Sequence, residues 1–403
     1  MKINSALAGL IFYPKTFTIG LYMFIVIHYN EIALKGRNRV FFEQKLRENI
    51  KRALRGLEVK KISRTESRIL VEIKKENLPE ALTRLAHIFG ASSFSPALAV
   101  KTDFKEIKKG ALLMAQAAQG KTFKIETKRS YKQFPLESMA VSRDAGGYVL
   151  EKSGLKVDVK NPNIIVRLEI LKEKTFIYSQ KIKGAGGLPQ GTSGKMLVLI
   201  SGGIDSPVAS YLMMKRGADL DFIHFHSYPF TDKASIEKAE ELIKILNRNK
   251  NGGKLYLAPI IDFQKEVVKK SDPKYRIILY RRLMYKVAEK VAAKCGAKAL
   301  VSGDNLGQVA SQTIENLAVV GDGLAMPIMR PLIGFDKEEI IALAKKIGTY
   351  EVSIEHHDDC CSIFSPKNPA TKSRLNDIME EEKKLKMNRW VGKILESVEI
   401  IKI

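Results

Sequence analysis

The fold of this chain is decided by one stretch, Met196-Leu197-Val198-Leu199-Ile200-Ser201-Gly202-Gly203-Ile204-Asp205-Ser206-Pro207-Val208-Ala209. Its first five residues form an apolar run, which is typical of a strand buried in a parallel sheet. Residues 207–215 have the composition of a helix with proline in its first turn. A strand, a glycine-rich turn and a helix N-terminus, in this order, present several backbone N–H groups and the positive end of the helix dipole to one anion. The stretch therefore predicts an α/β domain with a phosphate site in the turn.

The side chains of this turn suit a phosphate site. Gly202 and Gly203 allow the backbone to approach a phosphate closely, and the hydroxyl groups of Ser201 and Ser206 add hydrogen-bond donors. Asp205 cannot bind a phosphate because both are negatively charged, so it would orient a metal ion or the turn itself. The alternative is an ordinary tight turn between a strand and a helix. Two glycines alone would leave that alternative open, whereas the whole hexapeptide favours the phosphate site.

A glycine-rich segment, Gly184 to Lys195, precedes the stretch, and four of its first eight residues are glycine. Such a composition predicts a linker or loop. Its end, Gly194-Lys195, suggests a Walker A motif. A Walker A motif requires glycine at the position of Pro189 and Ser or Thr at the position of Met196. The sequence therefore excludes a Walker A site here, and the phosphate site follows the next strand.

Positive charge is concentrated in the half of the chain that precedes this segment. The chain has 403 residues, enough for two or three domains, and a formal net charge of +24. Residues 1–190 contain 35 basic and 17 acidic residues, whereas the remainder contains 33 and 27. This distribution favours a first half that binds a phosphate backbone and a second half with another task. A lysine-rich surface of the kind seen in thermophiles is the alternative.

The beginning of the chain contains two apolar pieces, Ala6 to Phe12 and Thr16 to Ile27. The charge-free piece from Thr16 to Asn30 is shorter than the roughly 20 apolar residues that a membrane-spanning helix needs. We expect Met1 to Tyr22 to be an extension that is not part of a folded domain, with a lipid anchor as the alternative. Three cysteines cannot build a disulfide framework, so we expect a cytoplasmic protein with no membrane partner.

The first half shows the patterns of short α+β elements. The segment Phe41 to Leu54 has apolar residues at every fourth position, which is the period of a helix. The other elements that the patterns predict are the helix Leu78 to Phe89 and the strands Phe24 to His28, Ile69 to Ile73, Phe123 to Thr127, Ile164 to Leu171 and Thr175 to Ser179.

Four segments together resemble the tRNA 4-thiouridine synthetase family: Glu31 to Arg39, Gly187 to Lys195, Leu199 to Ala209 and Leu306 to Thr313. Within them, Ser201 to Ser206 resembles the PP-loop of enzymes that split ATP between its α and β phosphates. The matches occur in both halves, in the order of the family. The resemblance implies a multidomain α/β protein with an extension (1–22), a ferredoxin-like domain (23–78), a THUMP RNA-binding domain (79–183), a linker (184–195) and a PP-loop ATP pyrophosphatase domain with a doubly wound parallel sheet (196–403).

The resemblance also implies an activity, ATP-dependent tRNA sulfurtransfer. The enzyme would adenylate O4 of the uridine at position 8 of tRNA with release of PPi, and a persulfide carried by a cysteine would then attack C4 and release AMP. This order is chemically sound because a carbonyl oxygen is a poor leaving group until it is adenylated. ATP and Mg²⁺ are the expected cofactors, and tRNA is the expected partner.

Residues can be carried over where the motifs match. Leu199 and Ile200 resemble positions whose backbone meets the nucleotide, and His224-Phe225 resembles a pair on the adenine side. Both pairs end predicted strands, where an open α/β sheet binds its ligands. The remaining nucleotide positions implied by the family are Ser201, Gly202, Gly203, Ser206, Arg281, Gly303 and Gln312. Taken alone, His224 would more often be a core histidine and Arg281 a solvated helix residue.

The segment His356 to Phe364 contains the adjacent pair Cys360-Cys361. Adjacent cysteines do not suit structural zinc, and only Cys295 remains elsewhere, so a cluster of four thiolates within one chain is impossible. We expect no resident metal, with a three-cysteine cluster as the alternative. The resemblance instead assigns Cys361 to sulfur transfer, with Cys360 beside it and Asp205 in the PP-loop. Because the neighbouring aspartates would raise a thiol pKa, activation must come from elsewhere, such as a helix end or the basic residues of the loop Lys367 to Arg374.

The chain differs from some family members at its end. Those members carry a rhodanese-like domain with a second working cysteine, whereas this sequence stops at Ile403 after a charged helix, Asp377 to Lys386, and a short tail. The sulfur donor must then be a cysteine desulfurase or another source of persulfide or sulfide. Sulfur transfer for thiamine thiazole synthesis and non-catalytic tRNA binding are the alternative functions, and homodimerisation stays open.

Overall fold

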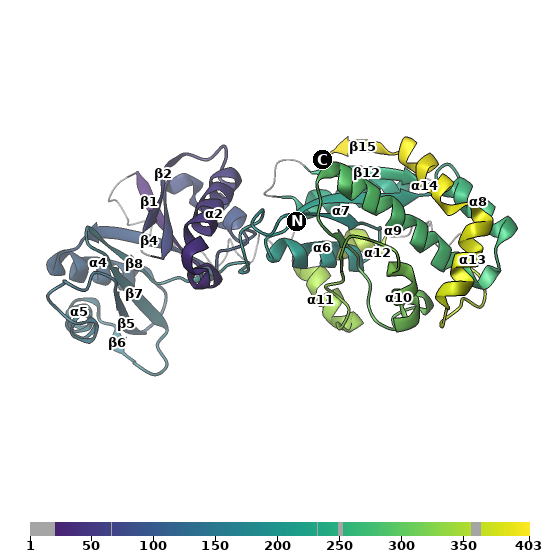
Figure 1. The fold of residues 1–403 in the computed structure, drawn as a ribbon. Helices are drawn as coiled ribbons and strands as arrows, with labels where there is room; N and C mark the ends of the chain where they lie inside the picture. Colours follow the sequence, from purple (N-terminus) through teal and green to yellow (C-terminus); the bar gives the residue numbers. More distant parts are fainter. Residues whose placement is uncertain (1–20, 66, 232, 249–252, 356–363) are drawn as a thin grey trace. The chain divides into compact units, whose positions relative to one another are not determined.

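The computed structural model describes residues 21–65, 67–231, 233–248, 253–355 and 364–403. The chain divides into two compact units, Met1–Pro189 and Gln190–Ile403 (Figure 1). The first unit is built on a mixed sheet and the second on a mostly parallel one, as the sequence predicted.

The bounds of the elements follow closely from the sequence patterns. The strands are β1 (Tyr22–His28), β2 (Val59–Thr65), β3 (Arg68–Lys74), β4 (Ser93–Lys101), β5 (Thr122–Arg129), β6 (Lys156–Val157), β7 (Ile164–Ile170), β8 (Lys174–Tyr178), β9 (Ile182–Lys183), β10 (Lys195–Leu199), β11 (Asp219–His226), β12 (Lys254–Pro259), β13 (Leu300–Val301), β14 (Ile328–Met329) and β15 (Glu399–Lys402). The α-helices are α2 (Arg39–Ala53), α3 (Leu78–Leu85), α4 (Phe104–Ala117), α5 (Ser138–Ser153), α6 (Asp205–Lys215), α7 (Ala234–Leu246), α8 (Ile261–Lys270), α9 (Arg276–Cys295), α10 (Ile314–Gly321), α11 (Lys337–Ile347), α12 (Tyr350–Ile354), α13 (Leu375–Leu385) and α14 (Met387–Glu396).

The sheet of the N-terminal unit runs in the order β2-β3-β1-β4-β8-β7-β5-β6, and β9 pairs with β4. Strand β4 joins two groups of elements, because its first residues pair with β1 and its last residues pair with β8. Helices α2 and α3 pack on the first group, and α4 and α5 pack on the second. The expected domain boundary after Leu78 falls at the start of α3, whose Leu82 and Leu85 belong to the first core. The first group therefore extends beyond that boundary, up to β4.

A buried ionic cluster lies in the N-terminal unit on two pairs of adjacent strands, β3 with β1 and β8 with β7, which flank β4 in the sheet. Glu169 of β7 accepts hydrogen bonds from His28 Nε2 at 2.7 Å and from the Tyr178 hydroxyl at 2.6 Å. Its second oxygen lies 2.9 Å from Arg68 Nε, and the Arg68 side chain is 1% exposed. Burial alone would raise the pKa of Glu169, but the hydrogen bond from His28 and the charges of His28 and Arg68 lower it to about 2. The carboxylate is thus ionised in the folded protein at neutral pH.

We expect Glu169→Gln to destabilise the N-terminal unit by about 3 kcal/mol at pH 7, because it leaves the buried Arg68 charge uncompensated. The folded pKa is depressed, so the stabilisation is complete above the ordinary value of 4.5 and is lost as the pH falls toward about 2. Amide exchange in β7, measured at pH 7 and pH 3, should show a smaller acid effect in the variant than in the wild type. Glu80→Gln removes an exposed pair with Arg84 and is the matched control; an equal effect there would contradict the prediction.

The glycine-rich segment between the units forms loops, and each of its ends is hydrogen-bonded to its own unit. The amides of Gly184 and Gly186 bond to the carbonyl groups of Ser92 and Ala91. On the other side, the amides of Gly191 and Ser193 both bond to the carbonyl group of Gly217. The last residue of the expected linker, Lys195, already belongs to β10.

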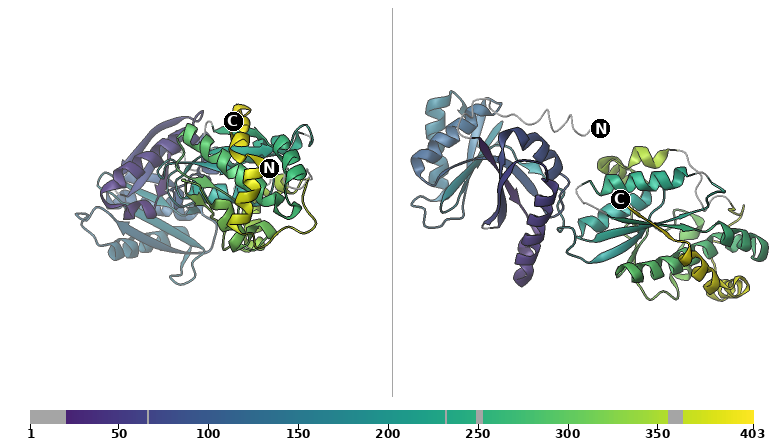
Figure 2. Two further views of the ribbon diagram at one scale, coloured as in Figure 1. Left: turned by 45° about the vertical axis from the view of Figure 1, so that its right-hand side comes forward. Right: turned by 90° about the horizontal axis from the view of Figure 1, so that it is seen from above.

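The sheet of the C-terminal unit has the order β14-β13-β10-β11-β12-β15, and all its pairs are parallel except β12 with β15. Helices α6, α7, α11 and α12 form one layer, and α8, α9, α10, α13 and α14 form the other (Figure 2). The chain moves from β10 outward to β11 in one direction and later to β13 in the other. The carboxyl ends of β10 and β13 therefore flank the point at which the strand order reverses, where open α/β sheets bind ligands.

Two expectations about the elements need correction, and one segment for which no element was predicted is folded. That segment is the tail after the charged helix: Met387, Val391 and Ile394 form the buried face of α14, and β15 pairs with β12. Strand β1 begins at Tyr22, inside the expected extension, whereas residues 1–20 lie outside the described residues. The helix predicted for residues 78–89 ends at Leu85, because the amides of His87 and Ile88 bond to carbonyl groups only three residues back.

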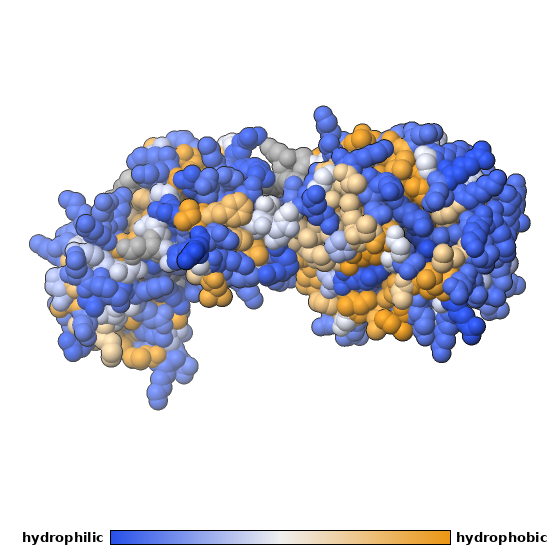
Figure 3. Space-filling view, in the orientation of Figure 1, coloured by the Kyte–Doolittle hydropathy of each residue, from blue (hydrophilic) through white to orange (hydrophobic). Residues whose placement is uncertain are grey.

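The surface matches the charged composition. Hydrophilic side chains cover most of both units in the view of Figure 3, and apolar side chains gather over the C-terminal unit near α10 and α11. Within the described residues, no helix combines the length and the apolar character that crossing a bilayer requires.

Candidate nucleotide-binding site

A cavity of about 560 Å³ opens at the switch point of the C-terminal sheet. The turn after β10 forms one side, and the turn after β13 and the start of α9 form the other. The lining residues are Leu199, Ser201, Asp205, Ser206, Ile277, Arg281, Met284, Tyr285, Ser302, Gly303, Asp304, Val309, Ala310, Ser311, Gln312, Ser365, Pro366 and Pro369. This volume is in the range of cavities that hold small-molecule ligands.

The turn after β10 is held by its own serines. The amide of Ser201 donates to Ser206 Oγ at 2.9 Å, and the amide of Gly203 donates to Ser201 Oγ at 3.3 Å. Helix α6 begins at Asp205, so its N-terminus and positive dipole end are adjacent to the turn. A Cβ atom on Gly303 would lie 2.8 Å from the Ser206 amide nitrogen, which shows how closely the two turns pack. The arrangement is that of an anion site at a helix N-terminus, as the sequence predicted.

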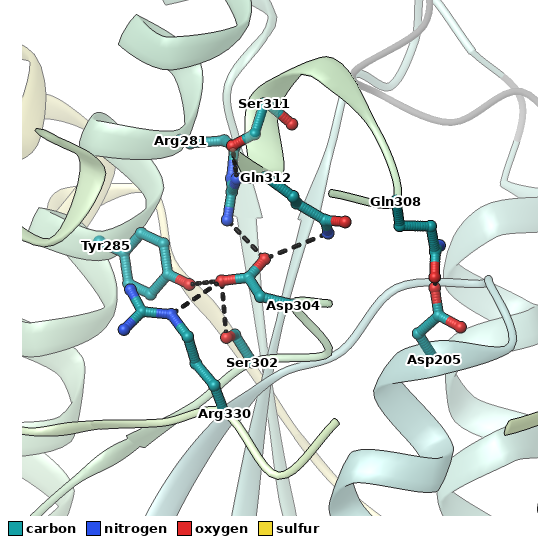
Figure 4. A network of polar contacts seen from close by, with 9 residues as sticks. All are labelled: Asp205, Arg281, Tyr285, Ser302, Asp304, Gln308, Ser311, Gln312 and Arg330. Carbon is teal, nitrogen blue, oxygen red and sulfur yellow. Dashed lines mark hydrogen bonds and ion pairs between the residues drawn. The ribbon is translucent and has the colours of Figure 1, made fainter. Parts of the chain in front are cut away.

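The opposite side of the cavity is organised by Asp304, whose carboxylate accepts from five donors (Figure 4). Arg281 Nη2 lies 2.5 Å and Gln312 Nε2 3.4 Å from one oxygen. The other oxygen accepts from the Tyr285 and Ser302 hydroxyls at 2.9 Å each and from Arg330 Nε at 3.3 Å. Asp304 thus fixes the positions of several side chains that line the cavity.

The protonation states in this network follow from burial and charge. Burial would raise the pKa of Asp304, but the Arg281 charge, the hydroxyls of Ser302 and Tyr285 and the Arg330 charge lower it below its ordinary value. Burial, with the Asp304 charge next, raises the pKa of Tyr285 to about 12. The carboxylate is therefore an acceptor and the phenol a donor at neutral pH, which matches the hydrogen bond between them.

Asp205 lies on the PP-loop side of the cavity and has two partners from other elements. Lys337 Nζ, at the start of α11, donates to Oδ1 at 2.6 Å, and Gln308 Nε2 donates to Oδ2 at 2.9 Å (Figure 4 shows the second pair). The side chains of Asp205 and Lys337 are 22% and 43% exposed, so solvent and ligands can reach both. This ion pair supplies a cation next to the expected phosphates.

The structure brings together most of the predicted nucleotide residues but not all of them. Those that line the cavity are Leu199, Ser201, Ser206, Arg281, Gly303 and Gln312, and Asp205 of the PP-loop, which was not among the predicted nucleotide residues, lines it as well. Ile200, Gly202, Gly203, His224 and Phe225 are not among its lining residues. The His224 ring is buried, with Nδ1 3.0 Å from the Ile200 carbonyl oxygen and Nε2 3.4 Å from Ser235 Oγ. Its side chain therefore supports the end of β10.

Cys360 and Cys361 lie outside the described residues, but the residues on either side of their segment are held at the site. Before it, Lys238 Nζ donates to the carbonyl groups of Ser353 and Glu355 at 2.9 and 2.6 Å, and Ser353 Oγ lies 3.4 Å from the Gly203 carbonyl oxygen. After it, Ser365 lines the cavity. Further along, the buried Asn316 side chain bonds to the backbone of Ala370 and Ser373. The described residues on both sides of this segment thus lie next to the PP-loop and the cavity.

Several residues of this site were missed by the sequence analysis: Ser302, Asp304, Tyr285, Arg330, Gln308 and Lys337. For Ser302 and Asp304 a signal existed, because polar residues directly follow the apolar run that forms β13. Tyr285 and Arg330 come from a helix and from the end of a strand far apart in sequence, and nothing local identifies them.

Family comparisons divide the chain into three parts. The description "ThiI ferredoxin-like domain" matches residues 24–95, "THUMP domain" matches residues 101–180, and "Thiamine biosynthesis protein (ThiI)" matches residues 191–387. The last of these covers the cavity and most of the C-terminal unit.

Whole-chain comparisons agree with this division. The chain is 47% identical over 375 residues to a probable tRNA sulfurtransferase of Caldanaerobacter subterraneus subsp. tengcongensis, covering 93% of this chain and 98% of that protein. It is 42% identical over 384 residues to one of Moorella thermoacetica, covering 95% and 98%. A crystal structure of a 4-thiouridine synthetase–RNA complex with bound ATP matches with a TM-score of 0.86 at 37% identity, covering 94% of this chain and 99% of the other. A protein of Pyrococcus horikoshii matches with a TM-score of 0.64 at 29% identity, covering 81% and 99%.

Proposed function

The chain belongs to the ThiI family of tRNA sulfurtransferases, and we propose that it uses ATP to activate O4 of the uridine at position 8 of tRNA and then replaces that oxygen with sulfur. The observation that carries the proposal is the cavity at the switch point, with a phosphate-binding turn on one side and the Asp304 network on the other. The related 4-thiouridine synthetase, at 37% identity, binds both RNA and ATP.

The two sides of the cavity suit different parts of ATP. The serines and amides of the PP-loop, together with Lys337, suit the negatively charged phosphates. Arg281 and Gln312, fixed by Asp304, lie on the opposite wall and suit the polar groups of the nucleoside. Leu199, on the cavity wall at the end of β10, suits the ribose and adenine edge. Ile200 and His224-Phe225 do not line the cavity, and their proposed role is to support this edge, with His224 Nδ1 hydrogen-bonded to the Ile200 carbonyl oxygen.

The carboxylates present suit a magnesium ion held mainly by phosphates. Among the described cavity residues, Asp205 and Asp304 carry carboxylates, and both oxygens of Asp304 already accept from cations or hydroxyls. No group of three or more His, Cys, Asp or Glu that could hold a metal ion occurs in the described part of the chain. Asp205 would therefore be the protein ligand, once released from Lys337, and a bound Mg²⁺ would neutralise charge on the phosphates.

The proposed reaction has two steps. First, O4 of the uridine attacks the α phosphorus of ATP, the bond to the β phosphate oxygen breaks, and PPi leaves; the PP-loop amides and Lys337 stabilise the charge on the leaving group. Second, the terminal sulfur of a persulfide on Cys361 attacks C4, and AMP leaves. A thiol then attacks Sγ of Cys361, which breaks the S–S bond and leaves the sulfur on C4. We assign that thiol to Cys360, and the disulfide that results is reduced by an external thiol.

The supply of sulfur requires another protein or a small donor. The persulfide on Cys361 would come from a cysteine desulfurase or another persulfide, which transfers its outer sulfur to the Cys361 thiol. Sulfide would serve only by attacking the Cys360–Cys361 disulfide left by a previous turnover, which it splits into the Cys361 persulfide and the Cys360 thiol. The residues on either side of the cysteine segment support the role of Cys361 in sulfur transfer, because Ser353 lies beside Gly203 of the PP-loop and Ser365 lines the cavity.

The N-terminal unit is proposed to bind the tRNA. It carries most of the excess positive charge of the chain, and its two parts match the ferredoxin-like and THUMP domain families. A patch of positive charge binds nucleic acid mainly through phosphates and loses affinity as salt rises. The division of labour is thus RNA binding before the linker and chemistry after it.

The family description also supports a second role, because it names thiamine biosynthesis. The same persulfide on Cys361 could serve a thiazole precursor without the PP-loop chemistry. A deletion strain that keeps 4-thiouridine in its tRNA but requires thiamine would favour this role over the first.

The proposed function is tested by incubating the protein with unmodified tRNA, ATP, Mg²⁺ and a persulfide donor. We expect absorbance of thiouridine in the long-wavelength ultraviolet, together with AMP and PPi in amounts equal to the thiouridine formed. Formation of ADP and phosphate, or of AMP without any dependence on tRNA, would contradict the proposal.

A further inference from the structure

Two aromatic rings are exposed on the loop that follows β11, at the same end of the sheet as the PP-loop. Tyr228 is 43% exposed and Phe230 is 58% exposed. The loop is nevertheless held in place, because the amide of Phe230 bonds to the Ser227 carbonyl oxygen at 2.8 Å. The buried Ser227 side chain in turn donates to Gln264 Oε1 of α8 at 2.6 Å. An anchored loop that presents large apolar rings to solvent needs an explanation other than core packing.

Each ring has a lysine over it. Lys265 Nζ of α8 lies 4.8 Å from the centre of the Phe230 ring, and Lys233 Nζ lies 5.4 Å from the centre of the Tyr228 ring. Proteins bind unpaired nucleotides with an aromatic ring next to a cation. The base stacks on the ring, and the cation neutralises the phosphate. Lysine is by contrast depleted from protein–protein interfaces, so the pairing of rings with lysines favours RNA over a protein partner.

The position of these rings connects them to the site. The Phe230 ring centre lies 5.9 Å from that of Phe364, which is partly buried against the core of the unit. Phe364 directly precedes Ser365, a residue of the cavity wall. A uridine whose O4 is adenylated in this cavity must leave its stack, which exposes that base and its neighbours. The exposed Phe230 ring, which contacts the residue preceding the wall residue Ser365, offers such a base a new stacking partner.

We propose that Tyr228, Phe230 and Phe364, with Lys233 and Lys265, form an aromatic surface that stacks an unpaired nucleobase of the tRNA substrate beside the cavity. The inference rests on the proposed function and adds a contact made by the C-terminal unit itself. Phe230 is the central residue, since it has the most exposed ring and contacts both Lys265 and Phe364.

The test compares steady-state kinetics of the full-length wild type and variants. For Phe230→Ala we expect kcat/KM for tRNA to fall about 10- to 100-fold, with KM for ATP unchanged. Phe230→Trp keeps a stacking face and should stay within about threefold of the wild type. Lys265→Ala should weaken tRNA binding and reduce its dependence on salt. Ile400→Ala is the matched control, because Ile400 is as exposed as Phe230, at 57%, and lies on the edge strand β15, outside the aromatic surface.

A second measurement locates the contact directly. Product tRNA that carries 4-thiouridine is irradiated with long-wavelength ultraviolet in complex with the wild type, and the cross-linked peptide is identified by mass spectrometry. We expect the cross-link within residues 227–233 or at Phe364. Unchanged kcat/KM for tRNA in Phe230→Ala, together with cross-links elsewhere, would refute the aromatic surface while leaving the proposed function intact.

Two other outcomes also decide the matter. If Phe230→Ala is slow only when sulfur comes from a protein donor, and normal with a small persulfide, the surface binds the donor and the RNA assignment is wrong. A wild-type protein that makes no thiouridine would refute the proposed function and the aromatic surface with it.

Discussion

Cys361→Ser is expected to reduce the formation of thiouridine at least about 1,000-fold, because the variant lacks the nucleophile that carries the sulfur. Binding of ATP should change less than about twofold, since the expected phosphate and nucleoside contacts come from the PP-loop and the Asp304 network. The two effects are measured separately, by thiouridine absorbance after incubation with tRNA and a persulfide donor, and by equilibrium binding of a fluorescent ATP analogue.

The third cysteine of the chain provides the matched control for this experiment. Cys295 ends α9 and packs against the core of the C-terminal unit, and its backbone carbonyl accepts from Lys195 Nζ at 3.2 Å. Cys295→Ser should therefore keep nearly full activity. If Cys361→Ser forms thiouridine at the wild-type rate, Cys361 does not carry the sulfur. If only Cys295→Ser loses activity, Cys295 carries the sulfur instead.

A Cys360→Ser variant separates the two adjacent thiols. If Cys360 breaks the S–S bond, the variant should become trapped with the tRNA joined to Cys361 through a disulfide. Dithiothreitol should then release thiouridine from the trapped complex. The species is measured as a protein–RNA band on a non-reducing gel. Full turnover without added thiol would show that another group breaks the bond.

The PP-loop could be predicted from sequence because all its parts are contiguous. The strand, the glycines, the serines and the helix lie within one short stretch, so local rules decide its shape. The Asp304 network depends instead on the sheet order. Arg281 comes from α9 and Arg330 follows β14, and the fold alone brings them to one carboxylate.

The same dependence on distant partners explains why some elements of the fold were not predicted from the sequence. Five strands of the N-terminal half were predicted, but β2, β4, β6 and β9 were not. Strand β4 pairs with β1 at one end and with β8 at the other, and the pattern along a single strand does not specify its pairing partners. For the C-terminal tail no element was predicted, because β15 is short. Its stability comes from pairing with β12, more than 140 residues earlier in the chain.

Asp304→Asn is expected to have the largest effect on the C-terminal unit. The substitution keeps the shape of the side chain but removes the charge that compensates Arg281 and Arg330. An amide also presents N–H donors where five donors already converge. Breaking a buried pair by removing one partner costs about 3–5 kcal/mol, which for a unit of this size lowers Tm by roughly 6–20 °C. Fluorescence of Trp390, the only tryptophan of the chain, reports unfolding of this unit, because its ring packs on Phe263.

The pH dependence provides a further check of Asp304. Its pKa is depressed in the folded protein, so its contribution to stability is complete above the ordinary value of 3.8 and is lost as the pH falls below it. The difference in Tm between wild type and Asp304→Asn should therefore shrink in acid. The control is Asp262→Asn, since Asp262 forms an exposed ion pair with Lys393 at 2.9 Å and should contribute at most about 1 kcal/mol.

Kinetics separate the role of Asp304 in the site from its role in stability. Arg281 and Gln312 are positioned by Asp304, so at a temperature well below its Tm the folded variant should bind ATP at least about 10-fold more weakly. Its KM for tRNA should stay the same, because the expected tRNA contacts lie elsewhere. A variant with lowered Tm but unchanged KM for ATP would show that Asp304 only stabilises the fold, and that Arg281 and Gln312 reach the nucleotide without its help.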